Sequence, residues 1–251
     1  MFGKLMKHEL LATGRVALPI LGGMALLSLL ARLTISGPEF LPFGLFTGVV
    51  TILYAMSYFA VAVGMAILLI QRFRRSVLGD EGCLTMTLPV SLHAILCAKA
   101  LTAVLWCVLA SALAAVCGAL VSFGVSGWRE ALDALLREGG PLYLTPGQLA
   151  LAAADGLAGL LQLVLLFYAA MAVGHSFHSH RTLLSVAAFF LLNTVIRGAM
   201  LGLFRGLAER IGQAGSFVPE LLLPALAGTL AFSALLYVIT WYCLSRRLNL
   251  E

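Results

Sequence analysis

The chain has 251 residues, of which 61% are hydrophobic and only 11% are charged, with a formal net charge of +5. A soluble domain usually carries about 25% charged residues, so this composition excludes an ordinary water-soluble globule and predicts a lipid-embedded protein. The positive residues form no single basic patch, which argues against a nucleic-acid-binding protein. The five cysteines lie mostly in apolar runs without CxxC spacing, which argues against a disulfide framework and a zinc site.

The N-terminal segment, residues 1–14, predicts an amphipathic helix that lies in the inner membrane interface. Its apolar side chains share one helical face, and Lys4 and Lys7 lie roughly opposite. Glu9 is the exception, because it projects onto the apolar side. Two interpretations stay open: a glutamate that snorkels to water, or a partner for a basic group at the cytoplasmic face.

Six apolar stretches follow, and each is long enough to cross a membrane, which needs about 20 residues. They cover residues 16–35, 45–70, 94–125, 149–174, 182–204 and 221–244. The first stretch does not have the features of a signal peptide, because it lacks a small-x-small cleavage site and is followed by further spans. We therefore predict an all-α integral membrane fold, with a six-span transmembrane domain over residues 15–251.

The distribution of arginine and lysine predicts the orientation of these spans. In an arrangement with the N-terminus inside, ten basic residues fall at cytoplasmic ends and six at outer ends. The dense clusters, such as Arg72, Arg74 and Arg75, are all inside, as the positive-inside rule requires. We therefore expect both termini to be cytoplasmic.

The segment between the second and third spans, residues 72–91, is a polar loop between two long apolar blocks. Two glycines bracket Asp80 and Glu81, and Ser91 can cap the helix that follows. A helix over residues 92–125 would be about 50 Å long, so its first turns would hold the loop clear of the lipid. Apolar side chains beside acids suit the docking of a soluble partner. The alternative is that the loop packs against the chain's own N-terminal helix.

The outer segment over residues 127–141 has apolar side chains at helical spacing and ends on Gly-Gly-Pro. It predicts a helix that lies flat on the outer leaflet. After it, Thr145 and Pro146 supply a cap and a first-turn proline for the fourth span.

The spans carry few groups that suit catalysis or ion coupling. Asp155 lies in the fourth span, where a single acid more often faces water or a neighbouring helix than carries a proton. His175, His178 and His180 could bind a metal by their spacing, but without a nearby acid or cysteine they are better explained as a basic cap on a cytoplasmic turn. The chain has no P-loop and no GxSxG motif. We therefore expect no enzyme, no bound metal and no ATP site on this chain.

Gly198, Gly202 and Gly206 recur every fourth residue near the outer end of the fifth span. Such a small-residue stripe lets two membrane helices approach closely. It is the clearest helix-packing signal in the sequence, and packing within the chain or against a second subunit are both open.

Four stretches share a pattern with one family: "FGKLMKHEL", "GDEGCLTMTLPVSLHAILCAKAL", "AVGHSFHSHRTLLSVAAFFLLN" and "YVITWYCLSRRLNLE". These stretches resemble the permease subunit of a bacterial type-2 ATP-binding-cassette (ABC) exporter. Because they run from the start to the end of the sequence, the resemblance covers nearly the whole chain. The most specific element is the run of an acid, Gly, x, Leu, Thr, x, Thr, Leu, Pro, Val and Ser over residues 81–91. The remainder is mostly a six-span hydropathy pattern.

The resemblance implies an exporter of the bacterial plasma membrane that pairs as a homodimer or heterodimer through its first and fifth spans. Each half docks a separate ATPase subunit, which binds the ATP and magnesium, and the interfacial helix with Glu9 lies near the docking loop. By this resemblance, the residues of this chain that would contact the ATPase are Gly79, Asp80, Glu81, Gly82, Leu84, Thr85, Leu88 and Pro89. This chain has Cys83 where a tyrosine or another large residue is usual. The cargo expected from this family is amphipathic or hydrophobic, such as a peptide or an antibiotic.

Two other classes of function are kept as alternatives. A stand-alone ion-coupled transporter would use Asp155 or the histidines and would need no partner protein. A non-transporting scaffold or sensor subunit would bind a partner without moving a solute. All three classes place the chain among membrane lipids.

Overall fold

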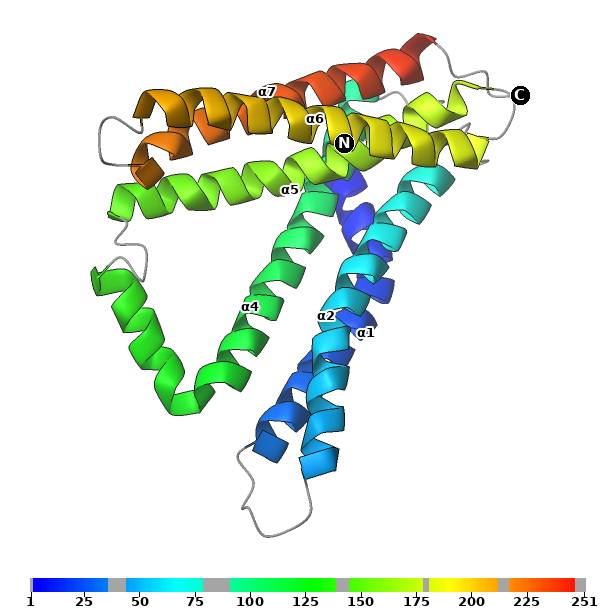
Figure 1. Ribbon diagram of the computed structural model, residues 1–251. Helices are drawn as coiled ribbons and strands as arrows, with labels where there is room; N and C mark the ends of the chain where they lie inside the picture. Colours follow the sequence, from blue (N-terminus) through cyan, green and yellow to red (C-terminus); the bar gives the residue numbers. More distant parts are fainter. Residues whose placement is uncertain are drawn as a thin grey trace. The chain divides into compact units, whose positions relative to one another are not determined.

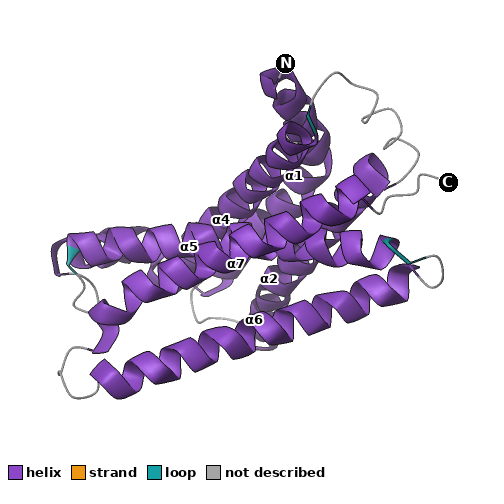
Figure 2. Cartoon of the chain, turned by 90° about the horizontal axis from the view of Figure 1, so that it is seen from above, coloured by secondary structure: helices purple, strands orange, loops and turns teal. Residues whose placement is uncertain are grey.

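The computed structural model describes residues 2–35, 44–78, 91–138, 145–177, 181–211 and 217–246. They are helical except for short caps and turns, and no strand occurs among them (Figures 1 and 2). The helices are α1 (Phe2–Ile35), α2 (Gly44–Phe73), the π-helical turn η1 (Arg74–Leu78), α4 (Leu92–Glu138), α5 (Pro146–His175), α6 (Arg181–Ile211) and α7 (Phe217–Arg246).

The described residues are all-helical, as predicted, and six of these helices are long and apolar enough to cross a membrane. The candidate spans are Met6–Ile35, Phe46–Phe73, Leu92–Phe123, Gly147–His175, Thr182–Leu207 and Leu221–Ser245. Five of the six begin and end within a few residues of the predicted boundaries. The side of the membrane on which each end lies stays a prediction.

The first span differs from the prediction at its start, which lies at Met6 instead of residue 16. The helix α1 runs without interruption from Phe2 to Ile35. The interfacial segment expected over residues 1–14 is therefore continuous with the first span, because its backbone is helical from Phe2 and no break separates the two.

The outer segment is likewise continuous with the third span, since α4 extends over 47 residues to Glu138. Figure 1 shows α4 bending sharply between two straight arms. Residues 122–127 read Ser-Phe-Gly-Val-Ser-Gly, and pairs of glycine and serine are common causes of helix kinks. We attribute the bend to this stretch.

The chain divides into two compact units, and α1, α2 and α4 each pass from one to the other. Unit 1 comprises residues 1–6, 69–104 and 144–251, and unit 2 comprises residues 7–68 and 105–143.

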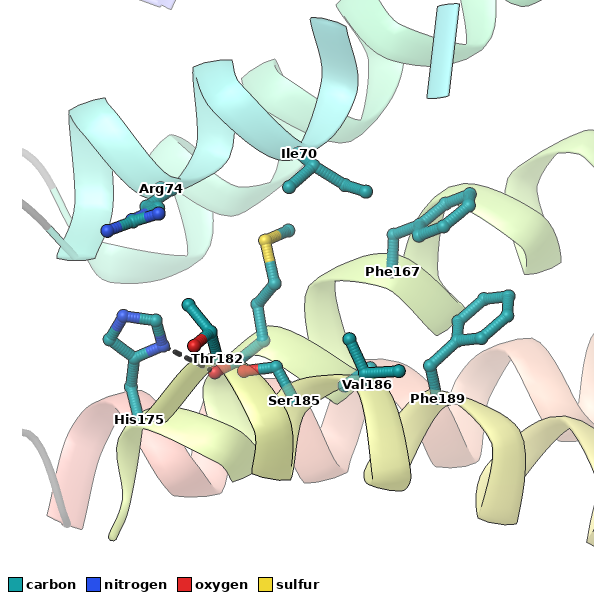
Figure 3. A pocket seen from close by; sticks show the side chains of 10 residues that line it. Ile70, Arg74, Phe167, His175, Thr182, Ser185, Val186 and Phe189 are labelled. Carbon is teal, nitrogen blue, oxygen red and sulfur yellow. Dashed lines mark hydrogen bonds between the residues drawn. The ribbon is translucent and has the colours of Figure 1, made fainter. Parts of the chain in front are cut away.

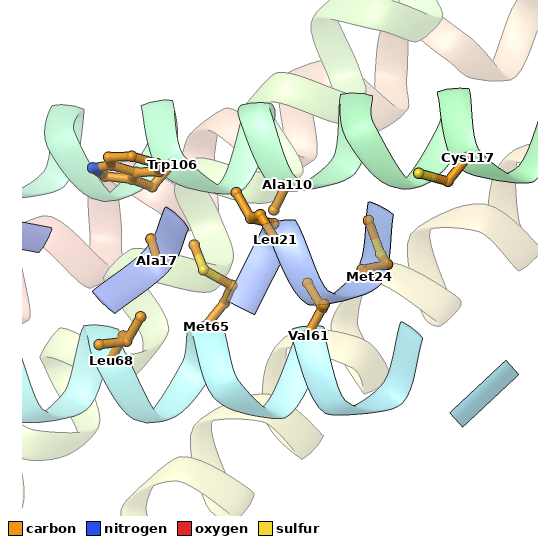
Figure 4. Packing of buried hydrophobic residues seen from close by; sticks show 9 residues of the cluster. All are labelled: Ala17, Leu21, Met24, Val61, Met65, Leu68, Trp106, Ala110 and Cys117. Atoms are coloured by element: carbon orange, nitrogen blue, oxygen red, sulfur yellow. The ribbon is translucent and has the colours of Figure 1, made fainter. Parts of the chain in front are cut away.

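Unit 2 is held by an apolar cluster in which α1 lies between α2 and α4 (Figure 4). The cluster consists of Ala17, Leu21, Met24, Val61, Met65, Leu68, Trp106, Ala110 and Cys117. Gly14 of α1 lies so close to Trp106 that an added Cβ would come within 2.9 Å of the indole ring. The hydroxyl of Tyr58 donates to the carbonyl of Ala114 over 2.9 Å. Helices in lipid associate through close packing at small residues and through interhelical hydrogen bonds. Unit 2 contains both kinds of contact.

Unit 1 is built around α5, which packs against both α6 and α7. Half of an apolar 18-residue stretch of α5 is buried, compared with 6% of the corresponding stretch of α6. At the end of α5 the backbone of Gly174 lies against Ser185 of α6, where a Cβ would overlap both the side chain and the backbone of that serine. The helix α5 is therefore the most extensively packed helix of unit 1.

Candidate functional site

The residues predicted to dock an ATPase lie outside the described part of the chain. This applies to all eight of them: Gly79, Asp80, Glu81, Gly82, Leu84, Thr85, Leu88 and Pro89. The structure does describe the two ends of their loop, residues 73–78 and 91–99, which we call the entry root and the exit root. Both roots belong to unit 1.

The entry root begins where α2 ends. Phe73 is only 1% exposed, and its ring stacks on Tyr168 of α5 with centroids 4.1 Å apart and an angle of 18° between the planes. After Phe73 the helix widens into the π-helical turn η1. Single π-turns of this kind are rare and often occur at functional sites. The buried stack of Phe73 on Tyr168 holds the point where the chain enters the loop in a defined position.

The exit root is fixed by a cap and by aromatic contacts. The amide of Ala94 donates to the carbonyl of Ser91 over 2.9 Å and approaches its Oγ at 3.4 Å, which confirms Ser91 as the predicted cap of α4. His93 stacks on Trp241 of α7 with centroids 5.4 Å apart. Its Nδ1 is also hydrogen-bonded to the hydroxyl of Tyr237, at 2.8 Å.

Tyr168 contacts both roots. Besides its stack on Phe73, its hydroxyl donates to the carbonyl of Lys99 over 3.4 Å, and its side chain is only 3% exposed. One buried residue of α5 thus joins the end of α2 to the beginning of α4. A displacement of the loop that moves its roots must therefore move or break a contact with α5.

A cavity of about 490 Å³ lies beside the exit root, between α4, α5 and α7. Its walls are almost entirely apolar, although Cys97, Ser233 and Tyr237 are among the residues that line it. This volume falls in the range of about 300–1,000 Å³ in which proteins bind small ligands. We call it the α4–α5–α7 cavity. Because Tyr237 also contacts His93, the cavity shares a residue with the cluster that fixes the exit root.

Asp155 is part of the contact between α5 and α7. The hydroxyl of Thr229 lies 3.0 Å from the Oδ1 of Asp155 and 2.9 Å from the carbonyl of Ala225, so it can donate to either. Ionisable side chains inside membrane helices are rare, and those present usually pair with a polar group of a neighbouring helix, as Asp155 does with Thr229. This geometry gives Asp155 a structural task.

The remaining predicted residues are spread over the chain. His175 is hydrogen-bonded through Nδ1 to the carbonyl of Met171, at 3.1 Å, whereas His178 and His180 lie outside the described residues. Across the described ranges, no three potential metal ligands come together. Glu9 lies on α1 with a partly exposed side chain.

The glycine stripe of α6 faces open space. Within the described part of the chain, a Cβ added at Gly198, Gly202 or Gly206 would meet no atom within 4 Å. Packing within the described chain therefore does not cover the stripe.

Sequence reasoning did not identify Tyr168, Phe73, His93, Tyr237 or Trp241 as site residues. Each is an aromatic or histidine side chain in or beside an apolar run, where such residues are common. The contacts between them join residues as far apart as 144 positions, and a single sequence contains no signal for such pairs.

No family model, curated protein or solved structure matches this sequence.

Proposed function

We propose that this chain is the permease subunit of an ABC exporter in a bacterial plasma membrane, with both termini in the cytoplasm. It forms the translocation path and docks a separate ATPase subunit through the loop over residues 72–91. The observation that supports this proposal most strongly is the position of Tyr168, which links both loop roots to α5. A docking loop can transmit force only if its ends are attached to the helices that must move.

In this mechanism the partner subunit binds ATP and magnesium and moves the loop. Because the entry root is stacked on α5 and the exit root on α7, the movement passes to these helices as rigid elements. Both helices line the α4–α5–α7 cavity. A shift of α5 relative to α7 would change the width of the cavity and expose or release its contents.

The cavity favours an amphipathic or hydrophobic cargo, such as a peptide or an antibiotic. Its apolar walls would contact the apolar part of the cargo, and the hydroxyl of Tyr237, which also contacts His93, would hydrogen-bond a polar group. Burial of apolar surface with a few placed polar groups is the usual composition of a ligand site.

The permease would function as a homodimer or heterodimer. The open stripe of Gly198, Gly202 and Gly206 supports this, because small residues allow a second helix to approach the backbone of α6. The bond between Asp155 and Thr229 favours the permease over an ion-coupled carrier, since a carrier needs an acid that exchanges its proton or ion.

The experiment that tests this proposal is affinity purification of the tagged chain from its own bacterium in mild detergent, followed by mass spectrometry. A double variant, Glu81→Arg with Leu84→Asp, alters the loop. A matched control, Glu130→Arg with Leu132→Asp, makes the same changes in the predicted outer segment. We expect an ATPase subunit to co-purify with the wild type and the control and to be lost from the loop variant.

Two results would contradict the proposal. If no ATPase subunit co-purifies with the wild type, the chain does not act as an ABC permease. If the ATPase follows the loop variant as well as the wild type, the contact has been assigned to the wrong segment.

A further inference from the structure

A second cavity lies at the entry root, between the end of α2, α5 and α6. It has a volume of about 240 Å³, and all of its lining residues belong to unit 1. We call it the α2–α5–α6 cavity. It shares no lining residue with the α4–α5–α7 cavity, which we propose to bind the cargo.

The polarity of this cavity changes along its length, as Figure 3 shows. Arg74 and His175 lie at one end, and Phe167 and Phe189 at the other. The two phenylalanine rings stack with centroids 5.0 Å apart at the apolar end. The hydroxyls of Thr182 and Ser185 lie between the two ends.

Arg74 supplies a charge for which the described residues provide no partner. Its side chain is exposed, and within the described ranges it has neither a hydrogen bond nor an ion pair. A guanidinium group presents several N–H donors in a fixed plane and binds phosphate in a bidentate manner. A cation at the mouth of an apolar cavity is complementary to a molecule with one anionic end and one hydrocarbon end.

The position and size of the cavity indicate which amphiphile fits. Arg74 follows the second span directly, at the level where the arginine distribution predicts the inner leaflet and its phosphates. Drug-sized ligands usually occupy about 300–1,000 Å³. A cavity of about 240 Å³ is therefore suited to a segment of one hydrocarbon chain.

We propose that the α2–α5–α6 cavity binds one acyl chain of an anionic phospholipid, whose phosphate contacts Arg74. The chain enters between α2 and α6 and ends against Phe167 and Phe189. Because Arg74 is the first residue of η1, a bound lipid also fixes the entry root. This inference does not require an ATPase partner, so it can fail or succeed independently of the permease proposal.

The test uses the purified full-length chain in lipid nanodiscs and a phosphatidylglycerol with a diazirine at the end of one acyl chain. After illumination, mass spectrometry locates the adducts on the protein. Phosphatidylcholine with the same photoreactive chain serves as the zwitterionic comparison. Glycerol 3-phosphate, added as a competitor, distinguishes a lipid headgroup from a free phosphate.

Two variants make the test specific. Arg74→Gln removes the charge at the cavity mouth, and Arg75→Gln removes the neighbouring charge, which does not line the cavity. Val186→Trp fills the cavity from a side chain that is more than half exposed, so it should fold.

We expect phosphatidylglycerol adducts at Phe167 or Phe189. Their yield should fall about tenfold in Arg74→Gln, the size of one charge-assisted contact, and should also fall in Val186→Trp. Arg75→Gln and glycerol 3-phosphate should leave the yield unchanged. Absence of adducts at these residues, equal labelling by phosphatidylcholine, labelling that is insensitive to Arg74→Gln, or competition by glycerol 3-phosphate would each overturn the proposal.

Discussion

The ring of Tyr168 lies stacked on Phe73, with centroids 4.1 Å apart, while its hydroxyl reaches the carbonyl of Lys99. Phe73 and Lys99 stand on opposite sides of the loop that we propose to dock an ATPase. Their common partner belongs to α5, the most buried of the six candidate spans. The loop is therefore attached at both ends to the centre of unit 1.

The two contacts of Tyr168 can be separated by mutation. Tyr168→Phe keeps the stack and removes the hydroxyl, so we expect a loss of about 0.5–1 kcal/mol in the free energy of unfolding, as for other hydrogen bonds between membrane helices. Tyr168→Leu also removes the stacked pair, which adds about 0.5–1.5 kcal/mol. Unfolding in a titration of mixed micelles with a denaturing detergent measures both values. Equal losses in the two variants would show that the stack contributes nothing.

The close approach of Gly14 to Trp106 predicts a strong dependence on side-chain size. Gly14→Ala places a Cβ within 2.9 Å of the indole, so we expect a destabilisation of about 1–3 kcal/mol, typical of overpacking. Gly22→Ala is the matched control on the same helix, because a Cβ there meets nothing within 4 Å of the described chain. The same unfolding titration should show no loss for Gly22→Ala. Similar losses at both positions would contradict the packing described for unit 2.

The open stripe of α6 predicts an effect on assembly without an effect on folding. Gly202→Leu should leave the stability of the chain unchanged, since nothing described lies within 4 Å, yet it should weaken a dimer that uses this face. Gly156→Leu on α5 is the control, as its position is also open. The mass of the protein–detergent complex by light scattering gives the oligomeric state. A dimer that survives Gly202→Leu would assign the interface to another face.

The contact between Asp155 and Thr229 distinguishes two functional classes. In Asp155→Asn an amide oxygen can still accept the hydrogen bond from Thr229, so a structural role predicts nearly unchanged export and stability. An ion-coupled carrier would lose transport in the same variant, because asparagine does not titrate. Thr229→Val removes the donor and should cost stability whichever class is correct. Vesicle transport assays with and without an ionophore compare the two variants.

Much of the fold could be predicted from the sequence, because hydropathy over about 20 residues depends only on composition and length. The spans, the cap at Ser91 and the capping box that Thr145 forms with Gln148 all rest on local patterns. The continuity of α1 through residues 1–14 was missed, since an amphipathic face does not show where a helix breaks. Sequence patterns favoured water or a neighbouring helix around Asp155 but could not identify its partner Thr229, which lies 74 residues away and has no local signature.

The site could be predicted only in part. The loop residues stand out because glycines, acids and a proline interrupt an apolar chain. Phe73, Tyr168 and His93, which hold the two loop roots, have no distinctive sequence context. Their roles arise from contacts between helices. The cavities also arise from the way the helices pack together. The sequence around Cys97 or Arg74 therefore does not indicate that either residue lines a cavity.

In the proposed mechanism, movement of the loop reaches the α4–α5–α7 cavity through Tyr168, and Cys97 can report that movement. Its side chain is exposed and lines this cavity. A variant in which the other four cysteines are replaced by alanine is reconstituted with its ATPase. The rate at which a membrane-permeant maleimide modifies Cys97 is then measured without nucleotide and after trapping with Mg-ATP and vanadate.

We expect trapping to change this rate severalfold, and Tyr168→Leu to abolish the change while ATP hydrolysis continues. A Cys97 rate that is the same in both nucleotide states, in a complex that hydrolyses ATP, would show that loop movement does not reach the cavity.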